Sequence, residues 1–217
     1  MRCVRACVFF LALFCASVAQ AGFFIPKGTS MAMFMYTPSS RSFDLTHGFT
    51  RDWSATLGWH RYENDDGEDR RDFTLLRANY LLYRGYGSGG IANVYVFGGP
   101  AYAEAEDGDD GLGWHAGLWG DYETRRVYAR LSVQTHQVED VGQTITTGQA
   151  LWAPYAADYE DIATWVGLQV ERRNHLSDAT EVTPMLRLFQ RDWWVDAGVS
   201  VNKAHRGDVF LNLMFLF

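Results

Sequence analysis

After its first 21 residues the sequence contains no cysteine and no long apolar segment. All three cysteines, Cys3, Cys7 and Cys15, lie before residue 22. The remaining 196 residues therefore form neither a disulfide nor a cysteine-ligated metal site. None of their apolar runs approaches the ~20 residues that a membrane-spanning helix needs. These absences exclude a disulfide-stabilised domain and a helical membrane protein.

Positively charged residues are scarce as well. Without Arg2 and Arg5, 17 basic residues stand against 26 acidic ones, which gives a formal charge of −9. Binding to nucleic acid requires a basic footprint, so nucleic acid is not an expected partner. The sequence also lacks internal repeats, low-complexity tracts, linkers and any motif for a cofactor. A single domain without a cofactor is the simplest interpretation.

The N-terminal segment has the three parts of a secretory signal peptide. Arg2 and Arg5 precede an apolar run over residues 8–18, and Ala19-Gln20-Ala21 is a small-x-small cleavage site. A charged start, a short apolar run and small residues at the cleavage site are typical of exported proteins. The predicted division is a cleaved signal peptide, 1–21, and one domain, 22–217.

The C-terminal residues form the most informative pattern of the chain. Val209, Leu211, Leu213, Phe215 and Phe217 occupy every second position, and the chain ends on the last of them. A period of two places these side chains on one face of a strand. In a soluble protein this strand would be an aggregation edge. The pattern resembles the C-terminal signature of bacterial outer-membrane β-barrels. That resemblance implies an outer-membrane location and contact with the barrel-assembly machinery through this strand.

The rest of the mature chain divides into strand-length segments of alternating polarity. In residues 126–138, for example, Leu131 and Val133 alternate with Ser132 and Gln134. This alternation predicts an all-β fold, a single antiparallel transmembrane β-barrel of about twelve strands, with ten strands as the alternative. The predicted strands are 29–37, 41–49, 53–62, 71–83, 91–103, 111–122, 126–138, 143–153, 161–173, 181–190, 193–203 and 207–217.

The connections predict the orientation of the barrel. If both termini lie in the periplasm, the odd-numbered connections are extracellular and include the acidic runs Glu63–Asp69 and Glu104–Asp110. Longer polar loops outside and tight turns inside are typical of these barrels. Carboxylates attract hard divalent cations, so we expect these runs to interact with Ca²⁺ or Mg²⁺ at the lipopolysaccharide surface. Solvated loops that only keep the rim soluble are the alternative. Aromatic residues of the outward face predict an interfacial girdle: Trp53, Trp59, Tyr80, Trp114 and Tyr122.

The opposite face of the strands is rich in charge. An isolated buried charge is very costly, so charges inside a barrel must pair or face water. They predict a structural ion-pair network or, alternatively, a water-filled path. Both signs are present, so neither cations nor anions are favoured. The predicted lumen charges are Asp44, Arg77, Asp121, Arg130, Glu171, Arg187 and Asp196.

A hydrolase is the alternative from another functional class, because outer-membrane lipid- and peptide-modifying enzymes have this size. Such an enzyme needs a nucleophile or activated water beside a base. His175-Leu176-Ser177-Asp178 offers these groups, but it lies in a polar turn where Ser and Asp are ordinary residues. His115 with Ser132 or Asp121 is the other conceivable set.

Three methionines suggest a metal. Met31, Met33 and Met35 alternate on the first strand, and His60, like His115 and His136, falls on the inward register. Thioether and imidazole ligands together suit Cu(I) or Ag(I), although methionine is also a common filler of apolar space. Successive sulfurs are roughly 6–7 Å apart along the strand, so they would act as a series of weak sites. His47 falls on the lipid side.

A second resemblance supports this hypothesis. Pro26-Lys27-Gly28-Thr29-Ser30-Met31, with the methionines that follow, is similar to the start of small outer-membrane proteins associated with heavy-metal efflux systems. Phe97-Gly98-Gly99 suits the same family. The sequence thus predicts a non-enzymatic outer-membrane barrel, a narrow channel or envelope protein that handles small solutes or ions. Its expected partners are outer-membrane lipid, lipopolysaccharide, the assembly machinery and metal ions.

Overall fold

The chain folds into one closed β-barrel. The computed structural model describes residues 25–63, 70–87, 89–105, 110–138, 141–158, 160–174, 180–202 and 206–217. Within these ranges there are twelve strands and no helix. The strands are β1 (Ser30–Thr37), β2 (Ser40–Gly48), β3 (Trp53–Glu63), β4 (Arg70–Tyr86), β5 (Ile91–Ala105), β6 (Gly111–Glu123), β7 (Val127–Val138), β8 (Val141–Trp152), β9 (Ala163–Arg173), β10 (Thr180–Gln190), β11 (Trp193–Val199) and β12 (Val209–Leu216).

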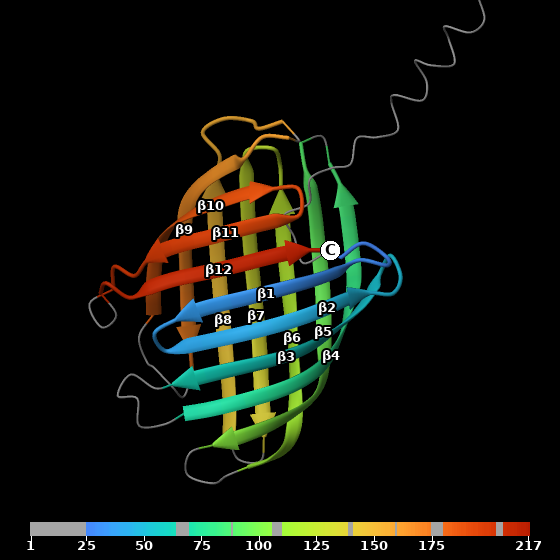
Figure 1. The fold of residues 1–217 in the computed structure, drawn as a ribbon, viewed down its shortest axis with the longest axis vertical. Coiled ribbons are helices and arrows are strands. Elements are labelled where there is room, and N and C mark those ends of the chain that lie inside the picture. The colour runs from blue at the N-terminus through green and yellow to red at the C-terminus, as the bar shows by residue number, and fades with distance from the viewer. Residues whose placement is uncertain are drawn as a thin grey trace, which may run out of the picture.

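Each strand pairs antiparallel with its sequence neighbours, and β1 pairs with β12 to close the sheet. At the seam, the backbone N–H groups of Ser30 and Phe217 donate to each other's carbonyl oxygens at 2.8 and 2.9 Å. Both termini of the barrel therefore lie at one end, which we call the terminal end; the opposite end is the loop end. In Figure 1 the near strands β1–β3 and β10–β12 cross the far strands at a steep angle, as strand tilt in a barrel requires.

The polarity of the barrel is the reverse of that of a soluble protein. On β7, Leu131 and Val133 are 65% and 39% exposed, whereas Tyr128 and His136 are buried in the lumen. The same alternation holds on β12, where Phe215 points outward and Asn212 inward. An apolar outer surface around a polar interior suits lipid, and closure leaves no strand edge unpaired in it. The predicted fold and its inward and outward faces are confirmed.

Most strand boundaries differ from the prediction by one to three residues. The segment predicted at 143–153 is a full strand, β8, over residues 141–152, so the ten-strand alternative is wrong. The strand β11 ends at Val199 and not at residue 203. There the chain turns, because Ser200 donates its N–H to the Asp208 carbonyl at 2.8 Å and accepts from Gly207 at 3.0 Å. Gly207 has a φ of 98°, which other residues rarely adopt.

Apolar side chains gather in the lumen at both ends. At the terminal end a cluster combines Ile25, Met31, Phe189, Trp194 and Met214. At the loop end a second cluster combines Tyr62, Phe73, Ala103, Val138 and Ile145. The polar part of the interior lies between these two clusters. No helix among the described residues is long and apolar enough to cross a membrane.

Several predictions fall outside the described residues. These are the signal peptide, most of the two acidic runs, and the His175-Leu176-Ser177-Asp178 segment. They stay predictions.

Candidate functional site in the barrel lumen

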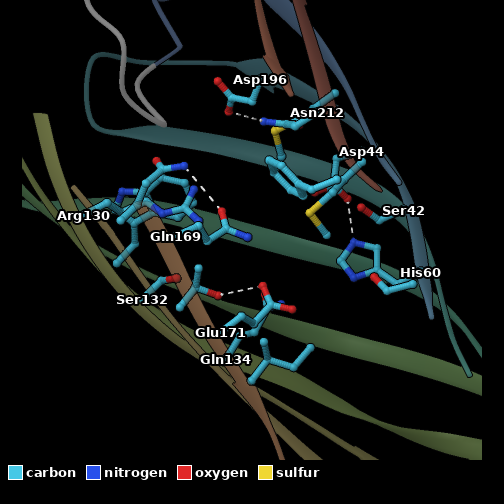
Figure 2. Close-up of a pocket in the computed structure, with 18 of the residues that line it drawn as sticks. Ser42, Asp44, His60, Arg130, Ser132, Gln134, Gln169, Glu171, Asp196 and Asn212 are labelled. Atoms are coloured by element: carbon cyan, nitrogen blue, oxygen red, sulfur yellow. Dashed lines mark hydrogen bonds and ion pairs between the residues drawn. The ribbon is translucent and has the colours of Figure 1, made fainter. Parts of the chain in front are cut away.

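A cavity of about 80 Å³ lies in the middle of the lumen. Its wall combines carboxylates, an arginine, hydroxyls and amides from strands on all sides of the barrel, as Figure 2 shows. Eight of its residues belong to the predicted metal ligands and lumen charges: Met33, Met35, Asp44, His60, Arg77, Arg130, Glu171 and Asp196.

Asp44 on β2 joins two other lumen residues. Its Oδ2 accepts from Nη2 of Arg77 at 2.9 Å, and its Oδ1 lies 3.0 Å from Nε2 of His60. Nδ1 of His60 in turn lies 3.2 Å from the Tyr62 hydroxyl. Gly58 leaves the space for this carboxylate, since a Cβ there would overlap Oδ1 of Asp44. The charge of Asp44 is thus paired and hydrogen-bonded in the interior.

Arg187 and Asp196 form a second pair, on β10 and β11. Nε and Nη2 of Arg187 donate to the two carboxylate oxygens of Asp196 at 2.6 and 2.9 Å. The Asn212 amide donates to the same carboxylate at 3.1 Å, and the Gln149 amide oxygen accepts from Arg187 at 3.2 Å. Such a two-point contact between guanidinium and carboxylate is geometrically specific. It holds four strands together across the lumen.

Glu171 on β9 pairs with Arg173, an arginine that the sequence prediction missed. Nε of Arg173 donates to Oε1 of Glu171 at 2.8 Å, and Nη1 donates to the Ser39 hydroxyl at 2.6 Å. Thr147 donates to the other oxygen of Glu171 at 3.2 Å. The signal was present in the sequence, because residues two apart share one face of a strand.

The remaining two predicted charges are arranged differently. Asp121 accepts from the Asn93 amide at 2.7 Å and from the Trp119 indole N–H at 3.1 Å. Arg130, directly opposite Asp121 in the β6–β7 register, stacks on the Trp119 ring at 4.3 Å. In the part of the chain that the structure describes, Arg130 forms no ion pair within 4 Å. All seven predicted charges therefore face inward, but only some of them pair.

The three predicted methionines face inward but do not share one site. Met33 and Met35 line the central cavity together with His60, which the register brings into one row with Met35 through Ser42. Met31 is buried in the apolar cluster at the terminal end. His47 is on the outward face, as predicted, and contacts the Ser30 hydroxyl. Among the described residues, no three His, Asp or Glu side chains already form a complete metal site.

The candidate hydrolase residues that can be placed are far apart. His115 lies directly opposite His136, whereas Ser132 lies opposite Trp119, four positions along β6. Four positions along a strand correspond to about 13 Å, and Asp121 is further still. The structure therefore does not bring His115 to either partner.

A larger cavity of about 570 Å³ opens at the terminal end. It lies among the turns that join β4 to β5, β6 to β7, β8 to β9 and β10 to β11. Trp165 and Phe189 form part of its wall, with Arg125 and Asp158 on its rim. This vestibule is separated from the central cavity by the apolar side chains that fill the terminal end.

No protein-family model and no curated protein sequence matches the chain. Among solved structures it is similar to the KdgM porin, with a TM-score of 0.50, 10% identity, and coverage of 87% of this chain and 99% of that chain. It is also similar to the translocator domain of the autotransporter NalP from Neisseria meningitidis, with a TM-score of 0.41, 10% identity, and coverage of 87% and 86%.

A loop-deletion form of OmpT, an outer-membrane protein of Vibrio cholerae, matches at a TM-score of 0.34 with 9% identity over 88% of this chain and 97% of that one. The likeness to the KdgM porin concerns the fold alone. It agrees with the closed, lipid-facing sheet described above. The chain has the fold of an outer-membrane β-barrel. Its apolar outer face is suited to membrane lipid.

Proposed function

We propose that this protein is a non-enzymatic barrel whose narrow, polar lumen handles water-sized solutes or small ions. The observation that carries the proposal is the central cavity of about 80 Å³. A water molecule needs roughly 10–15 Å³ of such volume, so the cavity has room for a few waters and none for a sugar. Apolar clusters fill the lumen on both sides of it. Passage would require these side chains to move.

The charges of the lumen support a small, weakly selective path. Paired residues of both signs, such as Asp44 with Arg77, face the cavity beside the guanidinium of Arg130, which forms no ion pair among the described residues. Paired charges hold the wall in one arrangement and cancel each other at a distance. We therefore expect low conductance and little preference between anions and cations.

Bilayer conductance of the purified protein tests the proposal. We expect small single-channel steps for the native protein and larger ones for Trp194→Ala, which removes a large side chain from the terminal-end cluster. Trp152→Ala is the matched control, because Trp152 is 49% exposed on the outer face. A complete lack of conductance in all three proteins would overturn the proposal, and so would native steps as large as those of an open porin.

A second candidate function is the handling of a soft monovalent metal. We propose that Met33 and Met35, with His60 across the same cavity, bind Cu(I) or Ag(I) weakly, and that Met31 adds a site nearer the terminal end. Thioethers and imidazoles are suitable ligands for these ions. Replacing all three methionines by Leu conserves volume and should raise or lower the silver sensitivity of cells. An unchanged sensitivity would contradict this role.

We further propose that the assembly machinery recognises the C-terminal strand and that the acidic connections meet lipopolysaccharide. Val209 is 51% exposed on the outer face of β12. Val209→Asp places a charge toward lipid on the closing strand, and we expect it to reduce the membrane yield. Val209→Leu, which keeps the same position apolar, is the control. A normal yield of Val209→Asp would contradict the proposed role of this strand.

A further inference from the structure

Three histidines from separate strands meet inside the loop-end half of the lumen. They are His60 on β3, His115 on β6 and His136 on β7. The centroids of the His115 and His136 rings are 4.4 Å apart, and the His60 centroid lies 5.6 Å from that of His136 and 6.4 Å from that of His115. His115 and His136 are direct cross-strand partners. Their side chains therefore leave the sheet side by side and point the same way.

Two of these imidazoles are buried without a hydrogen-bond partner among the described residues. His115 is 1% exposed and His136 is fully buried, yet none of their four ring nitrogens has a partner in the part of the chain that the structure describes. Gln143, the register neighbour of His136 on β8, is also fully buried, and within the same residues neither of its amide atoms has a partner. A buried polar group without a partner costs about 1–3 kcal/mol, and native proteins contain few of them. Six such atoms in one place indicate a ligand.

We propose that His115 and His136 bind one divalent transition-metal ion between them, with His60 as the third ligand. Metal–nitrogen bonds of about 2.0–2.1 Å place the ring centroids of two imidazoles on one ion roughly 4–6 Å apart. The His115–His136 separation falls in this range without any movement of the backbone. The strongest binding is expected for Cu²⁺, which leads the stability order of divalent ions on nitrogen ligands.

His60 is arranged as metal-binding histidines commonly are. Its Nε2 is held by the Asp44 carboxylate at 3.0 Å, and such a carboxylate partner typically orients a ligating imidazole. Its other nitrogen, Nδ1, meets only the neutral Tyr62 hydroxyl at 3.2 Å. Binding of the ion exchanges that hydroxyl for the metal. His60 and Tyr62 also line the central cavity, which gives the ion a route to the pair.

Aromatic rings pack against the histidine pair. Phe97 stacks on His115 with a centroid distance of 5.4 Å, and Phe73 lies 4.8 Å from His136. These rings and the neighbouring strands shield the imidazoles from bulk water. Entry of the ion requires the apolar side chains at one end of the lumen to move, but conduction through the whole barrel is not needed.

The test is titration of the purified barrel in detergent with Cu²⁺ alone, followed by calorimetry and by electron paramagnetic resonance. We expect one equivalent with nitrogen coupling from imidazole. His115→Gln and His136→Gln should each weaken binding by about 10–100-fold or more, since even the loss of an outer-shell partner has an effect of that size. His47→Gln on the outer face is the matched control and should bind as the native protein does. Each variant is shown to be folded if its unheated and heated samples differ in gel mobility as those of the native protein do.

Tyr62→Phe tests the role of His60 without removing a ligand. The change frees Nδ1 from its hydroxyl partner, so Cu²⁺ affinity should rise several-fold and the nitrogen coupling should stay the same. An affinity that is unchanged or reduced would contradict His60 as a ligand. An absence of Cu²⁺ binding to the native protein would overturn the site, and so would undiminished binding to the folded His115→Gln/His136→Gln double variant.

Discussion

The lumen holds two buried polar clusters, the Arg187–Asp196 ion pair and the His115–His136 pair. They are similarly buried, but they differ in how many hydrogen bonds their side chains make. Around Arg187, both carboxylate oxygens of Asp196 accept hydrogen bonds, and amides from β8 and β12 add two more. Around His115 and His136, the four ring nitrogens have no hydrogen-bond partner among the described residues. The guanidinium of Arg187 also lies between the Tyr128 and Trp194 rings, at 4.8 and 4.9 Å.

This difference in hydrogen bonding indicates that the Arg187–Asp196 pair is structural and that the His115–His136 pair is the candidate for binding a ligand. A buried ion pair joined by a two-point contact is strongly coupled to the fold, because removing one partner leaves the other charged and unpaired. Neutral imidazoles without partners gain nothing from the fold and are available to a ligand. The two clusters should therefore respond in opposite ways to substitution.

The largest effect is expected at the ion pair. Arg187→Met conserves most of the side-chain volume but leaves the Asp196 carboxylate buried without its cation, which should lower the free energy of unfolding by about 3–5 kcal/mol. Urea unfolding from lipid vesicles measures this loss. The double variant Arg187→Met/Asp196→Leu should recover most of it, because an apolar pair of similar size is often no less stable. If the free energy of unfolding of Arg187→Met were within about 1 kcal/mol of the native value, as for a typical surface substitution, the ion pair would not be strongly coupled to the fold.

An intermediate effect is expected at Gly58, two residues before His60. His60 is bonded to the ion-paired Asp44 and also lies near His115 and His136. A Cβ there would overlap Asp44 Oδ1 and lie 2.8 Å from Cδ1 of Leu75. Gly58→Ala should therefore cost about 1–3 kcal/mol of unfolding free energy, as overpacking does. Gly148→Ala on β8 is the matched control, since its Cβ would contact nothing within 4 Å. Equal stability of the two variants would show that the Asp44 carboxylate has room to move.

The smallest effect on stability is expected at the histidine pair. In metal-free buffer with a chelator, His136→Leu removes two unpartnered nitrogens and fills nearly the same space. It should leave the free energy of unfolding unchanged or raise it by up to about 1 kcal/mol. In saturating Cu²⁺ the native protein should become the more stable of the two, because a ligand that binds only the folded state stabilises it. A loss above roughly 2 kcal/mol without metal would mean that His136 makes hydrogen bonds of its own.

Much of the site could be predicted from alternation. The period of two placed Asp44, Arg187 and Asp196 inside, and it placed Leu131 and His47 outside. It could not show that Asp44 pairs with Arg77, or that Arg130 meets an aromatic ring and no carboxylate. Those contacts depend on which residues of different strands face each other inside the closed barrel, and the alternation along one strand does not specify this.

The separation of the methionines has the same origin. The residues Met31, Met33 and Met35 share one face of β1, and so the alternation of the sequence predicts that they form one row. In the barrel their neighbours differ, since Met31 meets side chains of β10, β11 and β12 at the terminal end while Met35 faces the cavity. One strand crosses several layers of the interior, and each layer has its own chemistry.

The sequence by itself determined an inside-out barrel of about twelve strands, because each residue's preference for lipid or water is expressed locally and repeats every second position. Only the tertiary structure decided that His60 meets His115 and His136. Its strand is not a neighbour of theirs in the sheet, so the contact is made across the lumen. Closure, tilt and stagger of the strands set which residues face each other there, and these are properties of the whole barrel.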